Sequence, residues 1–516
     1  MLMKYNQKYF TLVVIVGILL VFYVQYFNKK LLPNTATHQP FKNGNNTVIG
    51  GTRYGNDFAD QFCWISRSKS DWRAISSSCE EFMSWETGRK LSPLLETDSN
   101  KTFVSMIDLK PAGEISKIFI TTKTRQGFIK TIGGDSWRVK INGTATISVS
   151  VLDYGNGTYE IAFLCYDFGV YFVSIYLDYS LCNGLKNPPK DWFIRGNSQG
   201  KYQGVDVIGK PKDFLMAPLK GTPIKILIEE RRIQVPARAP LCKSNCRFIW
   251  DGNGRWRNNT WFSYFTDNSP KNRRDLAEEK PAGHLLVYGD SVNVFFAQSL
   301  QHRYKICRKL FRSCGFSYNW IYQVENVSLA KKQRDKKDFN ITKILDDFKR
   351  VVFVPKYNNR ESIVIVNFGL HYVESTNFSN YELLIEGFAK LITNQNESGE
   401  ERFMGNIIWK TTTAINKERA DYPQLHWRRF FTNHRIQLYN AYATNIMCQY
   451  SIPIIDAYAI SESYPFGTGT HAGRSAARND IVHYNNEAFY PIEESLENIF
   501  VYHNADIDEV NGKSFS

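Results

Sequence analysis

The chain has 516 residues, of which 43% are hydrophobic and 22% charged, a balance that excludes a disordered or fibrous protein. Its length allows two or three domains with a substantial core. The formal net charge of +14 favours anionic partners such as acidic glycans or a membrane surface. The densest basic cluster, residues 331–337, lies between two glycosylation motifs, so it is interpreted as a solvated loop and no nucleic-acid partner is expected.

The first predicted element is a transmembrane helix at residues 9–27. This run is almost wholly apolar, is followed by Lys29 and Lys30, and is long enough to cross a thin bilayer. No small-residue cleavage site follows it, so a membrane anchor is favoured over a cleaved signal peptide. Lysines on the two sides balance, and charge alone therefore leaves the orientation open.

Glycosylation motifs indicate the orientation of this anchor. Asn-x-Ser/Thr patterns begin at Asn45, Asn100, Asn142, Asn156, Asn258, Asn326, Asn340, Asn377 and Asn396. So many acceptor motifs place the bulk of the chain in the secretory lumen and predict a single-pass type II membrane glycoprotein. The alternative is a cytosolic protein that is rich in Asn and Thr.

Nine cysteines fit an oxidising compartment, although their number is odd. Closeness in sequence suggests three local disulfides: Cys63 with Cys79, Cys165 with Cys182, and Cys307 with Cys314. Cys242 and Cys246 have no second Cys or His cluster at zinc-finger spacing, so a disulfide is favoured there and no metal site is predicted.

Three segments are expected before the C-terminal domain. Residues 28–99 are predicted to be a luminal stem that ends in a small Cys- and Trp-rich packing element. Residues 100–181 show short alternating strands, for example at 137–141 and 146–151, with Gly- and Asn-rich turns between them, which favours a β-sandwich. Residues 182–282 are irregular and are interpreted as a connector packed on the following domain.

The predicted sandwich resembles a filamin-type immunoglobulin-like repeat. The resemblance rests on residues 133–139 (GGDSWRV), 153–159 (DYGNGTY) and 169–173 (GVYFV). It covers about one domain length and implies a fold rather than a chemistry.

Residues 283–516 have the pattern of an α/β layered domain. Apolar runs at 284–288, 363–366, 407–409 and 452–455 predict four buried parallel strands separated by helices. In such domains the site lies at the carboxyl ends of the strands. Polar residues follow three of these runs, at 367–371, 410–413 and Asp456, and this convergence favours one pocket.

Ser291 is the candidate nucleophile. It stands in Gly289-Asp290-Ser291, behind the first apolar run and ahead of a predicted helix, where unpaired backbone N–H groups are able to stabilise an oxyanion. The alternative is that Ser291 only caps the helix. The motif lacks the second glycine of the Gly-x-Ser-x-Gly elbow, which separates the chain from the α/β-hydrolases.

Asp480 and His483 are the candidate orienting carboxylate and general base. Their three-residue spacing puts both side chains on one side of a helical turn, so Asp480 can fix the tautomer of His483. The alternative is a solvated surface pair. His371 and His471 are rival bases, although His471 in a glycine-rich loop is more simply a surface residue.

Residues 283–516 resemble the PC-esterase branch of the GDSL/SGNH hydrolases. With an upstream immunoglobulin-like domain and one membrane anchor, the layout is similar to the neurexophilin-and-PC-esterase (NXPE) family. The resemblance implies a three-layer SGNH-like domain in a Golgi enzyme that moves acetyl groups onto or off sugar hydroxyls. It matches Ser291 to the nucleophile, Asp480 and His483 to the Asp-x-x-His pair, and Asn367 and Gly369 to the block lining the oxyanion hole. Asn367 on its own is also explained as a turn former at a strand end.

Three functions are therefore weighed. The first is a luminal glycan O-acetyltransferase with an acetyl-serine intermediate, a glycan or glycoprotein acceptor and acetyl-CoA as one candidate donor; no bound cofactor is predicted. The second is an O-acetylesterase of the same fold, since one triad serves both reactions. The third is a secretory-pathway interaction protein with a vestigial site and an immunoglobulin-like binding domain. The resemblance favours the transferase.

Overall fold

The computed structural model describes residues 53–85, 91–189, 213–231, 246–264, 283–318, 340–393, 403–421, 425, 428–469 and 479–502. The expected anchor at 9–27, the sequons at Asn45, Asn326 and Asn396, the basic cluster, Cys242 and His471 lie outside these residues. Among the described helices, none has the length and apolarity needed to cross a bilayer. The described part of Tyr54–Ser516 forms one compact unit.

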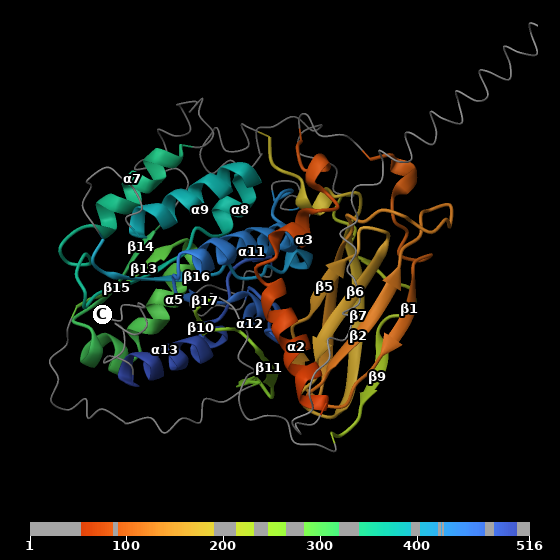
Figure 1. Cartoon of the computed structure of the whole chain (residues 1–516), viewed down its shortest axis with the longest axis horizontal. Helices are drawn as coiled ribbons and strands as arrows, with labels where there is room; N and C mark the ends of the chain where they lie inside the picture. Colours follow the sequence, from red (N-terminus) through yellow and green to blue (C-terminus); the bar gives the residue numbers. More distant parts are fainter. Residues whose placement is uncertain are drawn as a thin grey trace, which may run out of the picture. The chain divides into compact units, whose positions relative to one another are not determined.

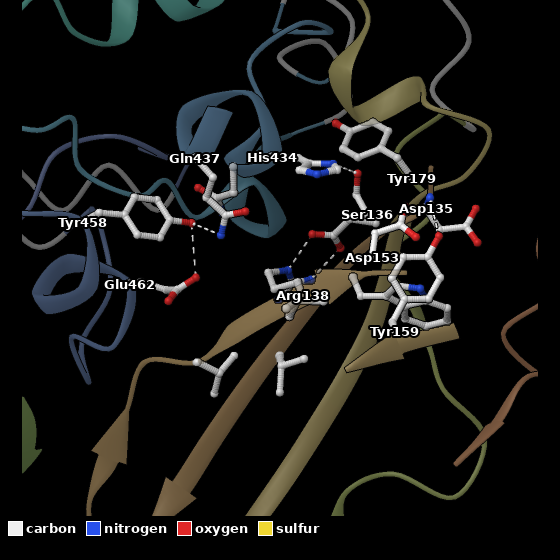
Figure 2. A pocket seen from close by; sticks show the side chains of 16 residues that line it. Asp135, Ser136, Arg138, Asp153, Tyr159, Tyr179, His434, Gln437, Tyr458 and Glu462 are labelled. Atoms are coloured by element: carbon white, nitrogen blue, oxygen red, sulfur yellow. Dashed lines mark hydrogen bonds and ion pairs between the residues drawn. The ribbon is translucent and has the colours of Figure 1, made fainter. Parts of the chain in front are cut away.

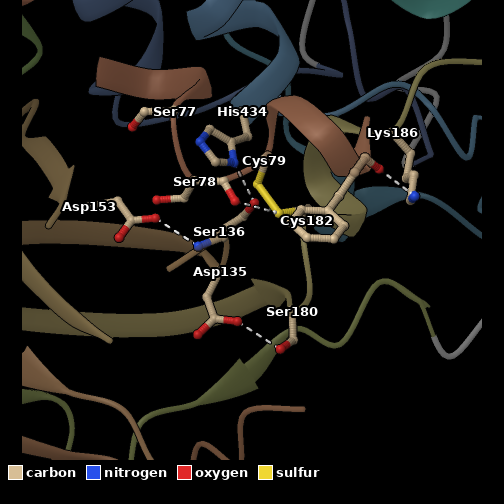
Figure 3. The surroundings of a disulfide bond; sticks show 12 residues. Ser77, Ser78, Cys79, Asp135, Ser136, Asp153, Ser180, Cys182, Lys186 and His434 are labelled. Atoms are coloured by element: carbon tan, nitrogen blue, oxygen red, sulfur yellow. Dashed lines mark hydrogen bonds between the residues drawn. A yellow bond between two sulfur atoms is a disulfide. The ribbon is translucent and has the colours of Figure 1, made fainter. Parts of the chain in front are cut away.

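A short helical segment precedes the first sheet, in the region that the sequence marked as Cys- and Trp-rich. Its elements are α2 (Arg53–Ser68), α3 (Trp72–Ser76) and the helical turns η1 (Glu80–Phe82) and η2 (Pro93–Leu95). Asp71 caps α3 by accepting the N–H of Ala74. A disulfide from Cys79 to Cys182 then attaches this segment to the chain that leaves the sandwich (Figure 3). Gly134, with φ +91°, lies against it, and a Cβ there would come within 2.4 Å of Cys182 Sγ.

The β-sandwich has two antiparallel sheets, as the alternating pattern predicts. The smaller sheet has the order β1-β2-β6-β5 and the larger the order β12-β11-β4-β3-β7-β8, with β9 also paired to β7. The strands of the smaller sheet are β1 (Phe103–Asp108), β2 (Ile115–Thr121), β5 (Ser150–Asp153) and β6 (Thr158–Leu164). Those of the larger sheet are β3 (Ser136–Gly143), β4 (Thr146–Ile147), β7 (Gly169–Tyr179), β8 (Ala217–Pro218), β9 (Ile224–Ile228), β11 (Gly254–Arg257) and β12 (Thr260–Ser263).

The sandwich departs from the sequence prediction in two ways. The single strand expected at 146–151 is broken, because the chain crosses from one sheet to the other between β4 and β5. The connector expected over 182–282 does not form a unit of its own. After the turn η3 (Asn183–Leu185), four of its strands complete the larger sheet, and β10 (Phe248–Trp250) joins the next domain. These strands are two to five residues long, too short to show a period of two in the sequence.

The C-terminal domain is built on a six-stranded sheet whose pairings are all parallel, in the order β10-β17-β16-β15-β13-β14. The four predicted strands appear as β13 (Leu285–Gly289), β15 (Ile363–Val366), β16 (Asn406–Lys410) and β17 (Ile454–Ile455). Their apolar runs are continuous because both faces of the sheet are covered. β14 (Cys314–Tyr318) and β10 were not predicted, since neither is a long apolar run.

Helices cover both faces of this sheet and make the three layers that the sequence predicts (Figure 1). In that view α7, α8, α9 and α11 lie above the strands, and α5 and α13 lie below them. The helices are α5 (Ser291–Gln301), α7 (Ile341–Val352), α8 (Leu370–Ser375), α9 (Phe378–Thr393), α11 (Asn433–Gln449), α12 (Tyr458–Glu462) and α13 (Tyr490–Tyr502), with the turns η5 (Lys305–Leu310), η6 (Lys417–Arg419) and η7 (Asn486–Ala488).

The disulfides correct most of the local pairings expected from the sequence. Cys307–Cys314 is confirmed, but Cys79 pairs with Cys182, and Cys246 pairs with Cys448, 202 residues away. Cys165 is free and buried in the sandwich. Closeness in sequence failed here because the two longer pairs join segments that only the tertiary fold brings together.

Glycosylation requires that the acceptor asparagine of a sequon is exposed. Of those within the described residues, Asn100, Asn142, Asn156, Asn258 and Asn340 are exposed and Asn377 is half-buried. Their use as glycan acceptors stays a prediction.

Candidate active site

Ser291 lies at the carboxyl end of β13, at the first position of α5. The five residues of β13 are all buried, so the strand is fixed on both faces and its end is rigidly placed. Asp290, not Ser291, caps the helix, because its Oδ1 accepts the N–H groups of Val292 and Asn293 at 3.1 and 3.4 Å. Ser291 is therefore not needed as the cap, and its hydroxyl points to another partner.

That partner is His483. Ser291 Oγ lies 2.7 Å from His483 Nε2, and His483 Nδ1 lies 2.8 Å from Asp480 Oδ2. The sequence predicted this pair on a helical turn, and that part is wrong, because residues 480–483 form an irregular bend. Asp480 Oδ1 accepts the N–H groups of Val482 and His483 at 2.9 and 3.1 Å, which brings the two side chains together without a helix.

The electrostatics suit a base held in one tautomer. Burial would raise the pKa of Asp480, but the hydrogen bond and charge of His483 and two backbone N–H groups lower it to about 2. Asp480 is therefore ionised at any working pH, and it accepts the Nδ1 proton of His483 so that Nε2 faces Ser291. Phe295 packs edge-on against the imidazole, with ring centroids 5.1 Å apart.

His371 is the one rival of His483 that lies within the described residues. It is near Ser291, but its ring contacts Tyr318. Its Nε2 is 3.2 Å from the hydroxyl of Tyr318, and that hydroxyl also hydrogen-bonds to Ser291. Burial and the nearby charges of Arg428 and His483 lower the pKa of His371 to about 4. A neutral His371 lines the site, while His483 is the histidine whose ring nitrogen is bonded to Ser291 Oγ.

The backbone N–H groups of Ser291 and Gly369 remain candidates for the expected oxyanion hole. No acceptor for the N–H groups of Ser291 and Gly369 is found among the described residues. Asp290 ties the two turns together, because its Oδ2 accepts the N–H of Leu370 at 2.9 Å. A Cβ on Gly369 would lie 2.0 Å from Asn367 Oδ1 and 2.6 Å from Asp290 Oδ2, so only glycine fits between them.

Asn367 is buried next to the site and joins three neighbouring segments by hydrogen bonds. Its Nδ2 donates to Lys410 O at 2.8 Å and to Thr412 Oγ1 at 3.2 Å, and its Oδ1 accepts from Asn293 Nδ2 at 2.9 Å. Both amide protons are therefore engaged in this conformation, so Asn367 is not a free donor for an oxyanion as the sequence suggested.

The remaining strand-end residues do not all converge on Ser291. Asp456, at the end of β17, binds Lys69 at 2.9 Å and Thr411 Oγ1 at 3.1 Å, and so serves the contact with the N-terminal helical segment. Within the described residues, no group of three or more His, Cys, Asp or Glu side chains gathers as a metal site would require. The arrangement around Ser291 suits nucleophilic catalysis by a serine.

Lys410 is buried beneath this site, with its ammonium 5.6 Å from the ring centres of Phe296 and Phe489. Burial lowers its pKa to about 8, against the opposing effect of Asp290. A lysine in the unfolded chain has a pKa of about 10.4. Between about pH 8 and 10 the unfolded state therefore binds more protons than the folded state, and the free energy of unfolding rises with pH.

We expect Lys410→Met to remove that pH dependence and to raise the free energy of unfolding at pH 7 by about 1–3 kcal/mol. Urea unfolding of both proteins at pH 7 and pH 9.5 measures the effect. A difference between wild type and variant that is the same at both pH values would contradict it.

Two groups at the site were missed by sequence reasoning. Asp290 was read only as part of the Gly-Asp-Ser triplet, although the preference of aspartate for helix caps indicated a role. Tyr318 is the last residue of β14, a strand that shows no clear period in the sequence, so nothing marked it.

No protein-family model matches the chain, and no curated protein matches its sequence. Among solved structures, the filamin domain of Lin-41 is 11% identical, with a TM-score of 0.18 over 26% of this chain and 99% of that one. A carbohydrate acetylesterase from Sinorhizobium meliloti is 10% identical, with a TM-score of 0.28 over 42% and 97% of the two chains. The aryl esterase of M. smegmatis is 10% identical, with a TM-score of 0.26 over 42% and 99%. These likenesses concern the coarse arrangement of strands and helices, so the case for a function rests on the side chains around Ser291.

Proposed function

We propose that this chain is a serine-dependent O-acyl enzyme of the secretory lumen, and that it transfers acetyl groups to the hydroxyls of glycans. The observation that carries the proposal is the hydrogen-bonded series Ser291, His483 and Asp480 at the carboxyl edge of a parallel sheet. An ionised Asp480 behind a histidine that faces a serine is the arrangement that activates serine for attack on esters and thioesters.

The reaction proceeds in two halves. His483 Nε2 takes the proton of Ser291 Oγ as the oxygen attacks the acetyl carbonyl, and the N–H groups of Ser291 and Gly369 stabilise the resulting oxyanion. The intermediate collapses to acetyl-Ser291 as His483 returns the proton to the leaving group. A sugar hydroxyl then loses its proton to His483 and attacks the acetyl carbon. The bond from that carbon to Ser291 Oγ breaks as His483 passes the proton to Oγ, which restores the free serine.

Transfer and hydrolysis share the acetyl-serine and differ only in whether a sugar hydroxyl or water attacks it. The resemblance to the NXPE layout supports transfer and a Golgi location, and acetyl-CoA is the candidate donor to test first. The intact series of hydrogen bonds speaks against a vestigial site, because a decayed site is expected to lose a member.

The test incubates the full chain with acetyl-labelled acetyl-CoA and a panel of glycans, and follows label on Ser291, on sugar and in free acetate. We expect label on Ser291 that passes to sugar, and none with Ser291→Ala. Free acetate from acetylated glycans without transfer would identify an esterase. Transfer that is unchanged in Ser291→Ala would reject the proposal.

A further inference from the structure

Glu418 connects the turn η6 of the catalytic domain to strand β3 of the sandwich. Its Oε1 lies 2.5 Å from Lys140 Nζ and 3.5 Å from Arg138 Nη1. Burial would raise the pKa of Glu418, but these two positive charges lower it, so the carboxylate is ionised and held by the sandwich. Arg138 is itself fixed, because its Nε and Nη2 donate to Asp178 at 2.8 and 3.1 Å (Figure 2).

The neighbours of Glu418 hold the segment that carries the catalytic pair. Asn416 N donates to Ile481 O at 3.0 Å, and Asn416 Oδ1 accepts the N–H of Thr468 at 2.7 Å. Thr468 Oγ1 donates to Asp480 O at 2.8 Å, and Gly469 N donates to His483 O at 2.8 Å. The backbone of Asp480–His483 is therefore fastened at three points to residues that η6 supports.

Other side chains of η6 keep the turn rigid. Arg419 donates to Phe466 O at 2.9 Å and to Thr468 O. Lys417 is buried on the opposite side, where its Nζ donates to Arg428 O at 2.6 Å and to Phe431 O at 3.1 Å. A displacement of Glu418 is therefore expected to displace the Asp480–His483 segment, because these hydrogen bonds hold the residues between them in fixed positions.

Besides this ion pair, the contact between the sandwich and the catalytic domain has an apolar part, in which Trp256 of β11 packs on Tyr464, and several polar bridges. A cavity of about 60 Å³ separates β3 and β7 from α11 and α12 (Figure 2). Ser136 Oγ, 2.6 Å from His434 Nδ1, bridges it (Figures 2 and 3). Ser148 Oγ makes a second bridge by donating to Glu462, which lines the cavity. Neither of these bridges bonds to the Asp480–His483 segment, whereas Glu418 belongs to the turn η6, which follows Asn416 and its bond to Ile481 O.

We propose that the sandwich domain is a positioning part of the catalytic centre, in which Arg138 and Lys140 hold Glu418 so that η6 keeps His483 in register with Ser291. This role rests on the proposed function of Ser291. It makes Glu418 and Lys140 positioning residues, which touch no substrate. Catalysis depends steeply on such geometry, since a displacement of about 1 Å in a reacting group lowers rates by about 100-fold.

The test compares Glu418→Gln, Lys140→Met and the double variant in the full chain. Each is expected to lower kcat about tenfold with KM unchanged within about twofold, and the double variant no further, because both changes cut one link. Lys140→Arg keeps the charge and should retain activity. Lys110→Gln is the matched control: it removes a lysine of the sandwich that is 42% exposed and forms an ion pair with the exposed Asp108 at 2.9 Å.

Amide hydrogen exchange of residues 479–484 is measured on the same proteins without substrate. We expect faster exchange in Glu418→Gln and no change in Lys110→Gln. This measurement does not need an active enzyme. If the wild type proves inactive but the exchange result holds, only the proposed function fails. Unchanged exchange in an active protein, with unchanged kcat in Glu418→Gln and Lys140→Met, would overturn the inference. An equal loss of kcat in the Lys110→Gln control would also overturn it.

Discussion

Ser291→Ala, His483→Ala and the double variant are all expected to lower kcat for acetyl release by one and the same factor, on the order of 10⁶. The reason is that the two side chains act as a unit across their 2.7 Å contact. Without the hydroxyl there is no nucleophile for His483 to activate, and without the imidazole the hydroxyl keeps its proton. The activity left over comes from the backbone N–H groups and substrate binding, which neither change removes.

The measurement is a double-mutant cycle on kcat with an acetyl ester, together with Asp480→Asn. That third variant is expected to lose about 10⁴-fold, because the amide imposes the wrong tautomer on His483 while leaving its position unchanged. Ser105→Ala, at an exposed position of strand β1, is the matched serine control and should match the wild type. Losses that multiply in the double variant would show that Ser291 and His483 act separately.

The parts of this site that were predictable are those with local causes. An apolar run before Gly289-Asp290-Ser291 predicts a buried strand whose end presents Ser291, and β13 has that form. The four strands with continuous apolar runs were recovered for the same reason, since burial on both faces is written into each run. The three-residue spacing of Asp480 and His483 also placed their side chains together.

The parts that were missed depend on distant segments. The spacing of Asp480 and His483 was right for the wrong reason, because an aspartate-capped bend and the bonds from Asn416 and Gly469 hold the pair instead of a helix. Asn367 was matched to the oxyanion hole, but its orientation is decided by Lys410, Thr412 and Asn293, which no local pattern reveals. The Cys246–Cys448 disulfide is likewise a product of the tertiary fold.

Arg435→Met is expected to lower the free energy of unfolding by about 3–5 kcal/mol. Arg435, on α11, is fully buried, and within the described ranges the hydrogen bonds of its guanidinium all go to neutral oxygen atoms. It donates to Val373 O and Thr376 O at the end of α8, to Lys186 O in the chain after the sandwich, and to Tyr439 Oη, at 2.6–3.0 Å. Methionine has a similar length but leaves these carbonyl groups buried without donors, and it releases three segments from one another.

The loss should appear as a decrease of about 10 °C in the Tm of the full chain, because about 1 kcal/mol corresponds to about 2–4 °C in a domain of this size. Arg350→Met is the matched control, since Arg350 is 64% exposed and forms an ion pair with Asp347 in the same helix; we expect a change within about 0.5 kcal/mol. Arg435→Lys keeps one donor group but not the branched guanidinium that reaches all three segments, so this variant should lose less stability than Arg435→Met but remain below the wild type. An Arg435→Met protein as stable as the control would mean that the guanidinium is replaced by water and that the packing of α11, rather than this side chain, joins the three segments.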